Sequence, residues 1–421
     1  MKTVYFVTYG GGHVAIVDLI ANRLAREPNI SFKILALTAA YKQIVDRYPA
    51  GTVKRMSDYL FLFDDSLDDI LNYGRMLADR EHNPTGGISK IESLAYLGMS
   101  FADLVHEVGE AGAHTEYTAR HRQAFLPVRT MKRILEHEQA DVVLATTAPR
   151  CEQAALRAGN ELGLPTVEVL DLFGELYPLP EAKHIVTTDE DSAASLRRQG
   201  LTDRHYYPFG QPVLDETTSR VAGVDVAACK TRLGLAPQQR ILLVAAGQPC
   251  VFRSDFSIEK TLPYEAVCEP LFGILHRIST QRAVTIILRR HPNESADAYM
   301  PWLKRYPEIR YGNDLLNLYE SLAVADTVLT HSSTVGVQAM ACGRTVFTYR
   351  HHLDNVYPLP RAMRPPFVFS NGFEELEAKM IDVLAVKRDL FQTPFAKSNA
   401  TEKIVELLIS LAEITKENSN R

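Results

Sequence analysis

The feature that most constrains this fold is a recurring order of apolar run, short glycine- or hydroxyl-containing turn, and helix. The first example is Thr3–Thr8, which is followed by three glycines and an apolar-periodic helix from about Val14 to Arg26. The runs are dense in Val, Ile and Leu instead of alternating with polar residues, which is typical of strands buried on both faces of a parallel sheet. The order therefore predicts an α/β protein with helix-covered parallel sheets.

Two such series are present, and the turn-rich segment Gln211–Val226 separates them. A chain of 421 residues is also long enough for two domains. The expected strands of the first series are Thr3–Thr8, Ser31–Leu37, Asp141–Ala145, Thr166–Leu170, Ile185–Thr188 and Tyr207–Gly210, and those of the second are Ile241–Ala246, Val284–Arg289, Thr327–Thr330 and Thr345–Tyr349.

The pattern predicts three parts. Residues 1–215 form an N-terminal Rossmann-like domain, in which the helix-rich segment Tyr59–Met131 is an elaboration. Residues 216–390 form a second Rossmann-like domain. Residues 391–421 form a C-terminal helix that can pack back on the first domain, and both Glu374–Val386 and Glu402–Thr415 are amphipathic.

Composition excludes several classes of protein. A net charge of -5 argues against a nucleic-acid partner, which would favour a basic surface. No apolar run of membrane-spanning length and no secretory leader is present, so we expect a cytoplasmic protein, with peripheral membrane contact left open. The oligomeric state is not indicated. Five scattered cysteines form neither a disulfide framework nor a zinc motif, and we expect reduced thiols.

The second series carries polar motifs directly after two of its strands. His291-Pro292 follows Val284–Arg289, and His331-Ser332-Ser333-Thr334 follows Thr327–Thr330 and opens a helix. In open parallel sheets, ligands bind beyond the carboxyl ends of the strands, and hydroxyls at a helix start suit an anion. We therefore predict a phosphate site made by His291 and the three hydroxyl residues Ser332, Ser333 and Thr334.

Each of these residues also has a structural interpretation. Ser332 or Ser333 would serve equally as an ordinary helix cap. His331 is either a ligand contact or a hydrogen-bonded structural histidine. Gln338, two residues past Gly336 on the same helix, either reaches a ribose hydroxyl or is an ordinary polar residue.

The two motifs together resemble the nucleotide half of bacterial glycosyltransferases with the GT-B fold, in particular capsule polysaccharide, polysialic acid and Kdo transferases that use CMP-activated acidic sugars. The layout, which includes Asp314-Leu315-Leu316, is also similar to UDP-N-acetylglucosamine 2-epimerases. The resemblance covers most of the chain. It implies two Rossmann-like domains with parallel sheets that face each other across a cleft, and a nucleotide-sugar ligand.

The resemblance also implies that the Gly247-Gln248 loop, after the first strand of this half, approaches the phosphates. Two departures bear on the chemistry. Capsule-type enzymes carry Glu where Gln338 stands. The epimerases carry an acidic pair where this chain has Ala339-Met340, and an H-R-x-E-N block where it has Gly247-Gln248-Pro249. Their proton transfers need those carboxylates, so the differences favour glycosyl transfer.

The first half opens with Gly10, Gly11, Gly12 and His13 after its first strand. The dinucleotide fingerprint G-x-G-x-x-G is incomplete, since its sixth position is Ala15, so a nicotinamide cofactor is disfavoured. The loop is similar to the Gly-rich loop of GT-B enzymes, including the peptidoglycan N-acetylglucosaminyl transferase, where it faces the cleft. His13 occupies the place of the catalytic histidine of many inverting enzymes of this fold.

His13 is accordingly our first candidate for the catalytic base, because a neutral imidazole can accept a proton from an acceptor hydroxyl. A helix-start structural histidine is the alternative. Asp171 and Glu175, just beyond a strand end, are the other bases we consider, and both also fit ordinary loop carboxylates. No paired acids have metal-ligand spacing, so we predict catalysis with no metal and no cofactor.

Taken together, the sequence predicts an inverting, metal-independent glycosyltransferase. The donor would be a CMP-linked nonulosonic or other acidic sugar first and a UDP-N-acetylhexosamine next, and the acceptor would be a glycan, a lipid-linked group or a protein. One alternative is a nucleotide-sugar epimerase or hydrolase of the same architecture. Another is a non-catalytic binding protein that keeps the fold.

Overall fold

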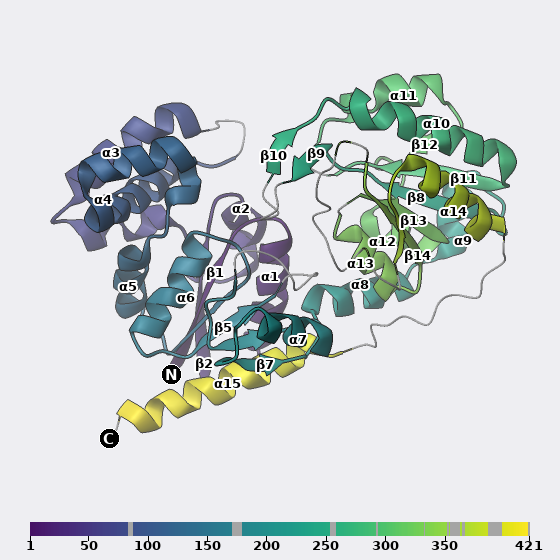
Figure 1. Cartoon of the computed structure of the whole chain (residues 1–421). Coiled ribbons are helices and arrows are strands. Elements are labelled where there is room, and N and C mark those ends of the chain that lie inside the picture. The colour runs from purple at the N-terminus through teal and green to yellow at the C-terminus, as the bar shows by residue number, and fades with distance from the viewer. Residues whose placement is uncertain are drawn as a thin grey trace. The chain divides into compact units, whose positions relative to one another are not determined.

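The computed structural model describes residues 1–82, 87–170, 179–252, 258–291, 294–331, 333–351, 353, 363, 367–385 and 398–419. The chain divides into two compact units, each described by itself (Figure 1). Unit 1 comprises Met1–Gly174, Pro178–Val213 and Asn399–Arg421, and unit 2 comprises Glu175–Tyr177 and Leu214–Ser398.

Unit 1 is built on a seven-stranded sheet in the order β3-β2-β1-β4-β5-β6-β7, and all of its strand pairs are parallel. Five of the six strands expected from the apolar runs are present, and the strand expected at Tyr207–Gly210 lies instead at His205–Tyr207. The additional edge strand β3 is two residues long, too short to leave a periodic signal. The strands are β1 Lys2–Thr8, β2 Ile30–Ala36, β3 Val53–Lys54, β4 Val142–Ala145, β5 Thr166–Val169, β6 His184–Val186 and β7 His205–Tyr207.

Helices cover both faces of this sheet. One face packs on α1 and on the C-terminal helix α15, where Ile20, Leu24, Ile404 and Leu408 are fully buried. The other face supports α5, α6 and a helical elaboration. The helices of unit 1 are α1 Gly12–Leu24, α2 Ala40–Ile44, η1 Val45–Arg47, η2 Met56–Phe63, α3 Leu67–Glu81, α4 Lys90–Arg120, η4 His121–Ala124, α5 Val128–His137, α6 Cys151–Glu161, α7 Glu190–Arg198 and α15 Ala400–Ser419.

The elaboration is the helical pair α3 and α4 with η2, which confirms that the segment from Tyr59 to Met131 is rich in helix (Figure 1). The pair packs closely because glycines stand at its contact. A Cβ on Gly98 would lie 2.0 Å from the Ile70 carbonyl oxygen, and one on Gly74 would lie 2.4 Å from that of Leu94. α4 kinks at Gly109, whose φ of 74° suits glycine.

Unit 2 contains a six-stranded parallel sheet in the order β12-β11-β8-β13-β14-β15, and an antiparallel hairpin of β9 and β10. The four strands expected from the sequence form the centre of the sheet. The short edge strands and the hairpin were not predicted. The strands are β8 Arg240–Ala245, β9 Cys250–Phe252, β10 Ile258–Thr261, β11 Val284–Arg289, β12 Ile309–Tyr311, β13 Thr327–Thr330, β14 Thr345–Tyr349 and β15 Val368–Ser370.

The core of unit 2 lies between this sheet and helices α10, α11 and α14, with Phe272, Leu275 and Phe347 almost fully buried. Both units therefore have the expected parallel-sheet α/β architecture, and the predicted fold class is confirmed. The remaining helices are α8 Pro212–Ala222, α9 Val226–Arg232, α10 Glu265–Gln281, η5 Ala296–Ala298, α11 Met300–Arg305, α12 Leu318–Val324, α13 Val335–Ala341 and α14 Phe373–Ala385.

Candidate functional site

A pocket of about 340 Å³ opens at the carboxyl edge of the unit 2 sheet, where β8, β11, β13 and β14 end. Open parallel sheets bind ligands at this edge because the loops that follow the strands converge there. No Asp or Glu is among the described residues that line it. They are Ala245, Ala246, Gly247, Gln248, Pro249, Cys250, Val267, His291, Thr330, His331, Ser333, Thr334, Tyr349 and His351.

Six of the residues predicted to bind the nucleotide line this one pocket. Pro292 and Ser332, which we also predicted, lie outside the described residues. Gln338 does not line the pocket; it is 7% exposed, and its amide nitrogen donates to Thr217 Oγ1 on α8 at 2.9 Å. The six that meet are Gly247, Gln248, His291, His331, Ser333 and Thr334.

His291 is exposed, and its backbone is held by Glu294. The His291 N–H donates to Glu294 Oε2 at 2.8 Å, while Oε1 accepts the hydroxyls of Tyr264 at 2.8 Å and Tyr299 at 3.0 Å. Burial and the adjacent carboxylate raise the pKa of both tyrosines, so they remain donors. Arg290 donates through Nε to Tyr311 Oη at 2.6 Å. These contacts fix the loop that presents His291.

Thr330 anchors the loop that follows β13. Its hydroxyl donates to the Ala245 carbonyl at 3.0 Å and accepts the Ser333 N–H at 3.3 Å. Ser333 Oγ in turn accepts the Val335 N–H at 3.2 Å, although the N-cap residue of α13 is Thr334, whose side chain makes no cap hydrogen bond. A hydroxyl that accepts one bond keeps its own proton to donate, so this contact is compatible with ligand binding by Ser333.

Three aromatic rings form one wall of the pocket. His331 stacks on His351 with ring centroids 5.2 Å apart and lies tilted against Tyr349 at 5.4 Å. His351 is 2% exposed; its Nδ1 accepts the Leu353 N–H at 3.2 Å, which leaves Nε2 to donate to the Cys250 carbonyl at 3.1 Å. Sequence reasoning missed His351. The sequence feature that could have identified it is its position just after β14, because His291 and His331 likewise follow β11 and β13.

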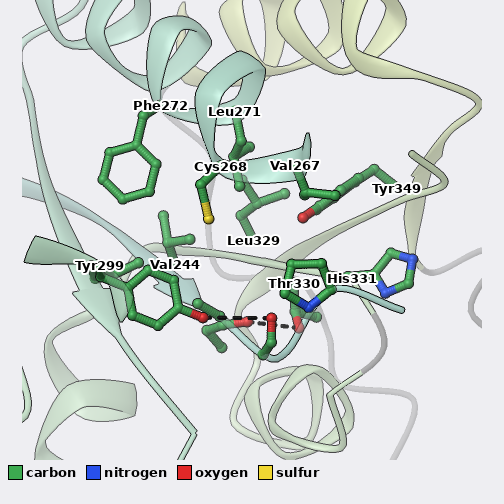
Figure 2. Close-up of a pocket in the computed structure, with 15 residues that line it drawn as sticks. Val244, Val267, Cys268, Leu271, Phe272, Tyr299, Leu329, Thr330, His331 and Tyr349 are labelled. Atoms are coloured by element: carbon green, nitrogen blue, oxygen red, sulfur yellow. Dashed lines mark hydrogen bonds between the residues drawn. The ribbon is translucent and has the colours of Figure 1, made fainter. Parts of the chain in front are cut away.

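An apolar recess of about 30 Å³ adjoins the pocket and shares several lining residues with it, including His331 and Tyr349. Figure 2 shows Val267, Cys268 and Leu271 above it and Tyr299 at one side. Burial raises the pKa of the Cys268 thiol to about 12, so the thiol stays protonated. None of the five cysteines is joined in a disulfide.

In unit 1, the Gly-rich loop joins β1 to α1. Gly11 has a φ of 76°, and a Cβ on Gly10 would lie 3.2 Å from that of Ala39, so the turn suits glycine at both positions. A Cβ on Gly12 would meet open space. His13, the second residue of α1, is half-buried, and its Nδ1 lies 2.6 Å from Thr146 Oγ1.

Thr146, in the loop that follows β4, and Glu152, in the first turn of α6, were not predicted from the sequence. Thr146 donates its hydroxyl to Glu152 Oε2 at 2.5 Å, and Glu152 is fully buried. Asp171 and Glu175, our other candidate bases, lie outside the described residues. Within the described part of the chain, no three His, Cys, Asp or Glu side chains are grouped to hold a metal ion, and no helix could span a membrane.

No family model matches the chain, and no curated protein matches it in sequence. Solved structures share its two-domain architecture at low identity. UDP-GlcNAc 2-epimerase from Neisseria meningitidis, bound to UDP-GlcNAc, is 13% identical, with a TM-score of 0.60 over 97% of this chain and 100% of its own. UDP-GlcNAc 2-epimerase from Methanocaldococcus jannaschii is 12% identical, with a TM-score of 0.58 over 97% of this chain and 100% of its own. MurG from Acinetobacter baumannii is 12% identical, with a TM-score of 0.54 over 97% of this chain and 100% of its own. These similarities establish a GT-B-like fold.

Proposed function

We propose that the protein is a nucleotide-sugar-dependent glycosyltransferase that needs no metal, in which unit 2 binds the donor and His13 of unit 1 is the base. The pocket of unit 2 is the observation that carries the proposal. The ends of four neighbouring strands, β11, β8, β13 and β14, supply imidazoles, hydroxyls and a glycine-containing loop to one cavity. Such donors suit the oxygens of a phosphate, and the described lining has no carboxylate to repel it.

A uridine diphosphate sugar, with an N-acetylhexosamine as the sugar, is the donor to test first. The support is that several solved proteins of this architecture were determined with UDP-GlcNAc or UDP. The CMP-linked acidic sugars suggested by the H-P and S-S-T motifs come next. The acceptor would be a hydroxyl of a glycan, a lipid-linked group or a protein.

In the proposed reaction, the acceptor oxygen forms a bond to the anomeric carbon, and the bond from that carbon to the phosphate oxygen breaks. The leaving phosphate takes the electron pair, and the acceptor's proton passes to His13. Donors from His291 and the β13 loop would stabilise the charge that develops on the leaving phosphate.

Replacing His291 by Ala should weaken nucleotide binding about 10- to 100-fold, because one hydrogen bond to a charged oxygen is lost. The side chain is exposed, so the variant should fold normally. The measurement is isothermal titration with UDP, CMP, GDP and their sugars. His276→Ala, at an exposed histidine on α10, is the matched control and should bind as the wild type does. If no nucleotide binds at millimolar concentration, or if H291A binds as tightly as wild type, the assignment of the pocket is wrong.

The second candidate is a 2-epimerase or hydrolase, favoured by the epimerases among the structures that match 97% of this chain. Against it stand Ala339-Met340 and Gly247-Gln248-Pro249, where the epimerase motifs have acidic residues. Product analysis separates the two reactions. Incubated with UDP-GlcNAc and no acceptor, an epimerase yields UDP-ManNAc and a hydrolase yields free sugar, whereas a transferase needs an acceptor for rapid turnover.

A further inference from the structure

We propose that Thr146 and Glu152 are positioning residues that set the tautomer of His13, so that its Nε2 is the nitrogen that receives the acceptor's proton. This inference rests on the proposed function, in which His13 is the base. It adds two residues that act through the histidine and do not themselves touch the substrate.

The first step concerns Glu152, whose side chain is fully buried at the start of α6. Its Oε1 accepts the Tyr9 N–H at 2.8 Å, and its Oε2 accepts the N–H groups of Thr146 at 2.9 Å and Ala148 at 3.2 Å. Backbone N–H groups can only donate. Both carboxylate oxygens must therefore be acceptors, which is the state that an ionised carboxylate satisfies.

The second step concerns Thr146, which has one hydroxyl proton. Because Glu152 Oε2 is an acceptor 2.5 Å away, that proton points to the carboxylate. The hydroxyl can then only accept from His13 Nδ1, at 2.6 Å. Nδ1 therefore carries the hydrogen, and in the neutral imidazole Nε2 has the free electron pair.

The loop that carries this chain of bonds is tightly constrained. Arg150, at the N-cap of α6, has a φ of 70°, and its guanidinium lies over the Tyr9 ring at 5.2 Å. Strained backbone of this kind persists only where the surroundings hold it, and it clusters at functional sites. Glu152 accepts from Tyr9 and from Thr146, so one carboxylate ties together the two segments beside His13.

The chemical consequence resembles the role of the buried carboxylate in a catalytic triad. When Nε2 takes the acceptor's proton, the imidazole becomes a cation that still donates from Nδ1 to Thr146. The negative charge of Glu152, one hydroxyl away, stabilises that cation. Loss of the hydroxyl should leave nucleotide binding intact and lower the rate of the proton-transfer step.

Thr146→Val is the test, because valine keeps the branched shape and the backbone N–H but removes the hydroxyl. In protein labelled with 15N-histidine, two-bond 1H–15N spectra report which ring nitrogen of His13 is protonated, and a His13→Gln sample assigns the signals. We expect the wild type and Thr146→Ser to show Nδ1–H, and Thr146→Val to gain Nε2–H. Thr147→Val, one residue along, is the control for the tautomer and should match the wild type.

The same variants are compared in turnover, measured as UDP released from UDP-N-acetylglucosamine in the presence of glycan, lipid-linked or protein acceptors. Thr146→Val should lose about 10- to 100-fold in kcat with the KM for donor within about twofold, and Thr146→Ser should restore most of the rate. An unchanged His13 tautomer in Thr146→Val overturns the inference whatever the activity. If the tautomer changes but the wild type turns over no nucleotide sugar, Thr146 and Glu152 still set the tautomer of His13, and the proposed transferase function is wrong.

Discussion

In unit 1, buried glutamate side chains accept hydrogen bonds from backbone N–H groups that have no partner in a sheet. Glu92 accepts the N–H groups of Met56 and Ser57, and Glu168 accepts those of Glu181 and Ala182. Both side chains are only 3% exposed. A buried N–H without a partner costs free energy, so a carboxyl group that satisfies two of them can be retained inside a protein despite its own desolvation. Glu152 combines this role with the contact to Thr146.

The ionisation of the Glu168 side chain should make the stability of the folded protein depend on pH. Burial, with Glu152 and Glu181 nearby, raises the pKa of its carboxyl from 4.5 to about 8 although two N–H bonds oppose the shift. A folded-state pKa above the unfolded one means that the stabilisation is complete below pH 4.5 and is lost as the pH rises through 8. Glu168→Gln cannot titrate, and its amide oxygen can accept the same N–H groups.

We therefore expect the free energy of unfolding of Glu168→Gln, measured relative to that of the wild type, to rise by about 3 kcal/mol when the pH is raised from 5.5 to 9. Urea unfolding followed by circular dichroism at both pH values measures the difference. The exposed Glu136→Gln is the control and should follow the wild type. A constant difference between Glu168→Gln and wild type at the two pH values would show that Glu168 is already ionised at pH 5.5.

At the scale of elements, the strands of both sheets were predictable because burial on two faces demands continuous apolar runs. β11, β13 and β14 have the predicted bounds. The edge strands β3, β12 and β15 were missed, since strands of two or three residues leave no periodicity. The loops after β11 and β13 were recognisable as site loops from their histidines and hydroxyls, although whether they bind a nucleotide stays a prediction.

The contacts across the sheet edges were not predictable. Thr146 lies 133 residues from His13, and neither it nor Glu152 belongs to a motif. Only the parallel pairing of β1 with β4 brings the two loops together. The same holds for Gln338, whose predicted ribose contact depends on the direction of its side chain, and the described side chain faces Thr217.

The contact between α3 and α4 supports a prediction about packing. A Cβ at Gly98 would lie 2.0 Å from a backbone oxygen, which cannot move without shifting α3. Gly98→Ala should therefore lower stability by about 1–3 kcal/mol. Gly273→Ala on α10, where the nearest atom is the flexible Arg277 guanidinium at 3.6 Å, should be neutral or gain up to about 1 kcal/mol. Thermal unfolding of both variants measures this, and equal melting temperatures would contradict the close packing.

At the scale of the whole molecule, unit 1 is discontinuous, because α15 completes a core begun at the N-terminus (Figure 1). Leu408 on α15 is fully buried in that core. Leu408→Ala should cost about 2–5 kcal/mol through lost contact and the cavity left behind.

Leu408→Ala should destabilise unit 1 and leave nucleotide affinity unchanged, because the pocket belongs to unit 2. Calorimetric unfolding with and without UDP measures both effects. The exposed Glu406→Ala on the same helix is the control and should change neither. A loss of nucleotide affinity in Leu408→Ala that matches its loss of stability would contradict the independence of the two units.

The return of the chain to unit 1 has a consequence for biosynthesis. Residues 400–419 leave the ribosome only after every residue of unit 2 has been made. Until then, the face of β1 and α1 that α15 covers is open to solvent, so the half that is translated first is finished last. Nascent chains should therefore depend on chaperones while unit 2 is being synthesised, and messages cut short just before the codon for Ala400 should yield a product that aggregates although its pocket is complete.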